Sequence, residues 1–184
     1  MILPKSIALS FLKHPGDRIL TPVLFLHGLF GNKNNWKSIA RQVTEATKRS
    51  TYCLDLRNHG DSGHTEPKEA SVLASASDIK TFLENQELKS CILTGHSFGG
   101  RVAMQFCSLF PESVERAVIL DVSPVSLPSS MSTLVSYIQC MERIIHSIPA
   151  SLPLAQIRKQ ADTILSDTIE VVILFFDQFN RKLV

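Results

Sequence analysis

A serine that could act as a nucleophile lies in a glycine-flanked turn. The segment Gly95–Gly99 (sequence GHSFG) follows an apolar run at Cys91–Leu93 and precedes apolar residues at helical spacing. Nucleophilic catalysis needs an exposed hydroxyl, and a sharp strand-to-helix turn provides one when its flanking residues are small. The turn also places Ser97 at a helix N-terminus, where backbone N–H groups favour negative charge. We therefore predict that Ser97 is a nucleophile, supported by a turn of Gly95, His96 and Gly99, rather than part of an ordinary glycine-rich turn.

Two backbone N–H groups are candidates for an oxyanion hole beside this serine. Phe98 directly follows the candidate nucleophile and provides the first N–H. Leu29 provides the second, in a loop that opens with His27 and Gly28 directly after the apolar run Val23–Leu26. His27 and Gly28 could instead only shape the turn. Both interpretations can hold together, because the donor is a backbone group.

Asp121 is the candidate acid that would orient a catalytic base. It follows the apolar run Ala117–Leu120, so it is expected at the same sheet edge as the nucleophile. An aspartate before Ser-Pro is also commonly a capping residue, and both roles stay open. Asp55 likewise follows a strand pattern, but Arg57 and Asp61 nearby favour pairing within its own loop.

Strand and helix patterns alternate along residues 1–122. The predicted strands are Ile7–Leu12, Val23–Leu26, Thr51–Leu56, Cys91–Leu93 and Ala117–Leu120. Helix-spaced apolar residues lie between them at 36–43, 72–83 and 102–110, and Pro111 is expected to end the last of these helices. This alternation predicts an α/β fold with a mostly parallel sheet and helices on both faces. Residues 123–184 begin with a Ser- and Pro-rich loop and continue in three helical stripes, at 134–145, 157–164 and 169–176.

Composition and charge exclude several classes of function. The chain has 184 residues, 44% of them hydrophobic and 20% charged, with a net charge of +2, so no dedicated nucleic-acid surface is expected. No apolar run approaches the roughly 20 residues of a membrane span. The cysteines lack the spacing of a metal or redox pair, so neither a metal nor a cofactor is predicted. The beginning of the chain shows no targeting segment, which favours a cytoplasmic location.

Four motifs in series resemble the α/β-hydrolase superfamily. They are LHGLFG at 26–31, DLRNHGDS at 55–62, GHSFGG at 95–100 and DVSPV at 121–125. Within the superfamily they look like the family of abhydrolase domain-containing protein eleven and related bacterial esterases. The resemblance implies a serine esterase or lipase for a small acyl-ester, thioester or lipid-like substrate. It also implies a helical cap at 123–184 and a mitochondrial location. Ser97 matches the family nucleophile and Asp121 matches the place of the acid.

The departure from the family lies at the C-terminus. The chain stops before the family's last strands and before its histidine, which follows the serine and the acid in chain order. His146 alone among the six histidines follows Asp121, and its place on the polar side of a helix favours a solvated or capping residue. The base would therefore come from His146 or from a partner chain. Alternatively, the chain is a catalytically impaired short isoform or fragment that binds acyl ligands or proteins. Without the last strands, Ala117–Leu120 would be an apolar sheet edge open to self-association.

Overall fold

A five-stranded sheet forms the centre of the first part of the chain. The computed structural model describes residues 3–124, 129–149 and 151–166, and the chain divides after Pro124 into two compact units. The strand order is β1-β3-β2-β4-β5, and all neighbours pair in parallel except β1 with β3. The strands are β1 (Phe11–His14), β2 (Val23–Leu26), β3 (Thr51–Leu54), β4 (Cys91–His96) and β5 (Val114–Leu120).

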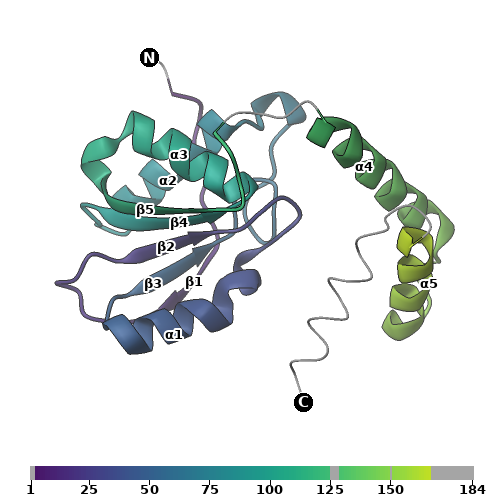
Figure 1. Cartoon of the computed structure of the whole chain (residues 1–184), viewed down its shortest axis with the longest axis horizontal. Coiled ribbons are helices and arrows are strands. Elements are labelled where there is room, and N and C mark those ends of the chain that lie inside the picture. Colours follow the sequence, from purple (N-terminus) through teal and green to yellow (C-terminus); the bar gives the residue numbers. More distant parts are fainter. Residues whose placement is uncertain (1–2, 125–128, 150, 167–184) are drawn as a thin grey trace. The chain divides into compact units, whose positions relative to one another are not determined.

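Helices cover both faces of this sheet, as the alternating pattern predicts. Helix α1 (Lys37–Thr47) lies on one face, and α2 (Val72–Asn85) and α3 (Phe98–Leu109) lie on the other (Figure 1). Helix α3 ends at Leu109, shortly before Pro111, as the sequence predicts. Short 3-10 helices occur at Lys33–Trp36, Pro67–Glu69 and Pro111–Ser113.

The alternation of side chains along β2 explains why both faces need a covering helix. Val23 and Phe25 pack in one apolar cluster with Ala40 of α1. Leu24 and Leu26 point to the opposite face and pack in a second cluster that includes Phe106 of α3. All four residues of β2 are buried, as expected of a central strand in a parallel sheet.

The prediction for the first strand was wrong in its bounds. Ile7–Leu12 was expected, whereas β1 runs from Phe11 to His14 and is antiparallel to β3. The backbone N–H of Ile7 donates to the carboxylate of Asp78 at 2.8 Å, and that of Ser10 donates to the Ser62 hydroxyl. Side chains therefore satisfy these N–H groups, where a neighbouring strand would do so in a sheet.

Strand β5 lies at the edge of the sheet, where the sequence placed an apolar edge. It pairs with β4 on one side and, within the described residues, with no strand on the other. Val118 is 44% exposed on this strand. The apolar edge is thus present, while self-association through it stays a prediction.

The described part of the second unit consists of two helices, α4 (Ser129–Ser147) and α5 (Leu154–Ser166). They account for the predicted stripes at 134–145 and 157–164, whereas the stripe at 169–176 lies outside the described residues. Cys140 is fully buried, and its thiol donates to the carbonyl oxygen of Ile164 at 3.7 Å. Across the described residues of both units, we find no helix with the length and apolar character to cross a membrane.

Candidate active site

The candidate site lies where four strands end at the same edge of the sheet. Strands β2, β3, β4 and β5 are parallel neighbours, so their carboxyl ends share one edge (Figure 1). That edge is the usual position of sites in open α/β sheets. The loops that begin there start with His27, Asp55, Ser97 and Asp121. The topology therefore brings together the motifs that the sequence spreads over nearly a hundred residues.

Ser97 occupies a strained turn between β4 and α3. Its φ of 51° is in the left-handed region, which bulky residues rarely adopt. Its backbone N–H donates to the Leu120 carbonyl at 2.9 Å, which ties the turn to β5. A Cβ at Gly95 would lie 2.4 Å from the Gly99 carbonyl oxygen, and one at Gly99 would lie 2.5 Å from that of Leu26. The predicted strand–turn–helix geometry is present, and these close approaches explain the glycines.

The loop that contains Leu29 begins directly beside the candidate nucleophile. A Cβ at Gly28 would lie 3.0 Å from His96 Nδ1 and 3.4 Å from Ser97 Cβ. The Gly31 N–H then donates to the Gly28 carbonyl at 3.0 Å and closes a turn over Leu29. On the other side of the serine, Phe98 is the first residue of α3, so its N–H has no partner within the helix. The segments that carry both predicted oxyanion donors thus adjoin Ser97.

The His27 side chain connects this loop to the residues that follow β3. Its ring is buried, and its Nε2 accepts the Leu56 N–H at 3.1 Å while Nδ1 donates to the Gly28 carbonyl at 2.8 Å. Burial lowers the pKa of His27 more than the hydrogen bond to Gly28 raises it. A neutral imidazole therefore links the end of β2 to the residues after β3, which gives His27 a structural role.

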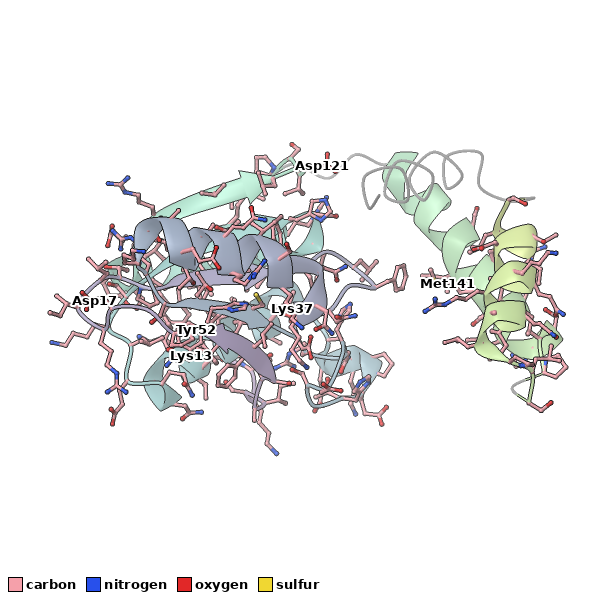
Figure 2. The ribbon with its side chains drawn as sticks, turned by 90° about the horizontal axis from the view of Figure 1, so that it is seen from below. Lys13, Asp17, Lys37, Tyr52, Asp121 and Met141 are labelled. Carbon is pink, nitrogen blue, oxygen red and sulfur yellow. The ribbon has the colours of Figure 1, made fainter. Side chains whose placement is uncertain are left out.

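Asp121 is exposed at the end of β5 and faces a histidine that was expected only to shape the turn. Its side chain is 87% exposed, and its Oδ2 lies 3.6 Å from Nε2 of His96. Figure 2 shows Asp121 directly after its strand. His96 is paired with Leu120 in the β4–β5 register, which places it one residue from Asp121 across the sheet. Sequence alone carried no signal for this contact, because it depends on strand register.

His146, the other histidine considered as a base, lies on α4 in the second unit. Its side chain is exposed and borders a surface groove together with Gln139, Glu142 and Arg143. The exposed position agrees with the expectation of a solvated histidine. Its role as a base stays a prediction.

Asp55 is engaged within its own loop region, and one of its partners was not anticipated. Its buried carboxylate accepts from Lys33 Nζ at 2.6 Å, from the Lys33 N–H and from the Asp61 N–H at 2.9 Å. Burial alone would raise the pKa of Asp55, but these hydrogen bonds outweigh it and hold the pKa below its usual value. The expected partner Arg57 instead pairs with Asp78 at 2.7 Å. With three donors on its carboxylate, Asp55 is a structural residue and a poor candidate for the acid.

Metal-ligand clusters and cysteine thiols are the other candidate site chemistries in the described ranges, 3–124, 129–149 and 151–166. Within them, no cluster of three or more His, Cys, Asp or Glu side chains is arranged to hold a metal ion. Burial raises the pKa of Cys53 and of Cys91 to about 12, so neither thiol forms a nucleophilic thiolate near neutral pH.

Comparisons with known proteins agree with this geometry. The family model described as "alpha/beta hydrolase fold" matches residues 21–154. A protein of Mus musculus named sn-1-specific diacylglycerol lipase ABHD11 is 38% identical over 166 residues, covering 90% of this chain and 52% of the relative. A protein of Wickerhamomyces anomalus named probable alcohol acetyltransferase is 34% identical over 143 residues, covering 78% of this chain and 40% of that relative.

A solved structure of a marine microorganism esterase superposes with a TM-score of 0.74 at 32% identity, covering 92% of this chain and 61% of that one. These comparisons confirm the fold class and the resemblance that the four motifs indicate. The chain spans about half the length of the curated relatives it matches.

Proposed function

The chain belongs to the alpha/beta hydrolase fold family, and from this premise we propose that it is a serine hydrolase of carboxylic esters or thioesters. The observation that carries the proposal is the strained turn at Ser97, which stands between β4 and α3 with the Gly28 loop against it. Ser97 is half-buried there, and the segments that carry the Leu29 and Phe98 N–H groups adjoin it, which supports an assignment to acyl transfer.

In the proposed reaction the hydroxyl oxygen of Ser97 attacks the acyl carbonyl carbon and its proton passes to a histidine base. The N–H groups of Leu29 and Phe98 hold the oxyanion of the tetrahedral intermediate. Collapse of that intermediate expels the alcohol or thiol, which takes up the proton, and leaves an acyl group on Ser97. Water then attacks the acyl-enzyme with the same base, releasing the carboxylic acid and restoring the serine. We assign Asp121 to orient this base, and the source of the base, His146 or a partner chain, stays a prediction from the sequence.

Two features favour an apolar acyl substrate. Leu29 and Phe30 are large apolar residues of the loop beside Ser97, and they are 38% and 51% exposed. Exposed apolar side chains next to a nucleophile suit an acyl chain better than a charged substrate. The names of the similar proteins, a diacylglycerol lipase, an alcohol acetyltransferase and an esterase, all concern carboxylic esters.

A second candidate function is a binding module that retains the acyl site without turnover. One observation favours it: within residues 3–124, no hydrogen bond joins Ser97 to a histidine, and Asp121 faces His96. A serine hydroxyl without a base is a weak nucleophile. Losing the base of such a triad costs about 10⁶ in turnover in the subtilisin case.

A fluorophosphonate probe separates the two candidates. We expect the wild-type chain to be labelled, Ser97→Ala to be unlabelled, and Ser38→Ala, which changes an exposed serine on α1, to behave as wild type. Hydrolysis of a short-chain nitrophenyl ester should follow the same order. If the wild-type chain is labelled no faster than Ser97→Ala, the serine is not activated, the hydrolase proposal is wrong and the binding module remains.

A further inference from the structure

The turn at residues 28–31, here called the oxyanion loop, has a conformation that its sequence does not favour. Its hydrogen bond joins Gly31 N–H to the Gly28 carbonyl, and φ is positive at Phe30 (61°) but not at Leu29. This is the pattern of a type II turn, whose third residue is normally Gly or Asn. A bulky aromatic residue at that position favours rotation of the Leu29–Phe30 peptide towards a type I turn. Some other contact must therefore hold the peptide in place.

His59 makes that contact. Its Nε2 lies 3.3 Å from the Phe30 nitrogen and its Nδ1 lies 2.8 Å from the Arg57 carbonyl oxygen. A backbone N–H can only donate and a carbonyl can only accept, so the proton of this imidazole is on Nδ1 and the lone pair is on Nε2. The ring thus accepts the N–H of the peptide that would otherwise rotate. A rotated peptide would turn its carbonyl oxygen towards the same lone pair.

The backbone of His59 is itself firmly placed. Its N–H donates to the Leu56 carbonyl at 3.0 Å, and its carbonyl accepts the Ser62 N–H at 3.2 Å. The Ser62 hydroxyl donates to the Asp55 carbonyl at 2.7 Å. Gly60, with φ of 54°, packs against Asp55 so closely that a Cβ there would lie 2.3 Å from the carboxyl carbon. The loop after β3 is therefore a rigid support from which His59 can hold a second loop.

The same imidazole contacts the turn that carries Ser97. It stacks on the Phe98 ring with 6.1 Å between centroids and 27° between planes, and it lies 5.0 Å from the ring of His27. One side chain thus touches both residue segments whose N–H groups are the candidate oxyanion donors. It binds one by a hydrogen bond to Phe30, next to Leu29, and the other by stacking.

We propose that His59 is a positioning residue that holds the oxyanion loop in its type II conformation and in register with Phe98. This inference rests on the proposed function, because it assigns the loop to oxyanion binding. His59 does not touch the reacting atoms. It fixes the orientation of the Leu29 N–H by preventing rotation of the peptide that follows.

Substitution of His59 by phenylalanine tests the proposal directly. His59→Phe keeps an aromatic ring for stacking but removes the acceptor, so the Phe30 amide hydrogen should exchange with solvent about two- to tenfold faster by NMR, as expected for loss of one hydrogen bond. His59→Gln retains an acceptor oxygen and should restore much of the protection. His64→Phe is the matched control, since His64 is exposed in the same loop, and it should leave the Phe30 exchange rate unchanged.

Labelling of Ser97 by a fluorophosphonate provides the functional measurement. In His59→Phe the rate constant of the covalent step should fall while the reversible binding constant of the probe is unchanged, and His59→Gln should recover part of the rate. Unchanged Phe30 exchange in His59→Phe, or a long-range ¹H–¹⁵N spectrum that places the proton of His59 on Nε2, overturns the proposal.

Faster exchange with an unchanged labelling rate overturns the assignment to oxyanion binding. A wild-type chain that is not labelled at all contradicts the proposed function instead, and the exchange measurement then still decides whether His59 holds the loop.

Discussion

Alanine at Gly99 should destabilise the fold through a backbone collision at the nucleophile turn. The added Cβ would lie 2.5 Å from the Leu26 carbonyl oxygen and 2.6 Å from that of His27, and both belong to the backbone at the end of β2. Overpacking costs typically 1–3 kcal/mol, and a contact with backbone belongs at the upper end because no side chain can rotate away. The better helix propensity of alanine offsets at most about 1 kcal/mol. The expected net loss is therefore about 2 kcal/mol.

Thermal unfolding followed by circular dichroism measures this loss. For a chain of this size about 2 kcal/mol corresponds to a decrease in Tm of roughly 4–8 °C. Gly63→Ala is the matched control, because its Cβ would meet Ile7 Cδ1 at an ordinary 3.4 Å and its φ is not positive. That variant should be neutral or slightly more stable, through the smaller entropy of its unfolded chain. Equal Tm values for Gly99→Ala and Gly63→Ala would contradict the close packing of the Gly99 backbone against the end of β2.

Three further predictions concern the supports of the site and the sheet edge. Asp55→Asn breaks the buried pair with Lys33 and should cost about 3 kcal/mol in urea unfolding, whereas Asn at the exposed partner Asp61 should cost less than about 1 kcal/mol. Because burial holds the pKa of His27 below 6.5, the unfolded chain binds more protons than the folded chain near that pH, and the free energy of unfolding should fall as the pH is lowered from 7 to 5. A free energy of unfolding that does not change over this pH range contradicts the buried neutral ring. Val118→Lys should reduce concentration-dependent association in sedimentation velocity, and a wild-type chain that is monomeric at every concentration refutes the open-edge argument.

The central strand β2 could be located from sequence, β3 and β4 only in part, and the first strand not at all closely. Val23–Leu26 forms a continuous apolar run because both faces of β2 are covered, and its predicted bounds match the structure. Ile7–Leu12 is also largely apolar, yet only its last two residues pair in the sheet. The difference arises from Asp78, whose carboxylate takes the Ile7 N–H. A hydrogen bond between residues 71 positions apart leaves no periodic pattern in the sequence.

The local parts of the site were predictable because each depends on a short segment. The turn at Ser97 and the loop at Gly28 need small residues where backbones meet, and glycine records that need directly in the sequence. The pairing of Asp55 was predicted only in part, since Asp61 is close in sequence but Lys33 reaches it from a different loop. Closeness along the chain was not sufficient either, because Arg57 lies two residues from Asp55 and pairs with Asp78 instead.

The contacts of His59 and His96, which link segments of the site, could not be predicted from sequence. His59 lies in the motif DLRNHGDS, where nothing in its neighbours distinguishes a ring exposed to solvent from one that accepts the Phe30 N–H. His96 faces Asp121 only because β4 and β5 are parallel and in register. Both contacts join loops from different strands, so they exist only once the sheet has formed. The turn at Ser97 can therefore be inferred from five consecutive residues and the strand and helix patterns beside them, whereas the groups that orient its surroundings emerge only from the packing of the strand ends.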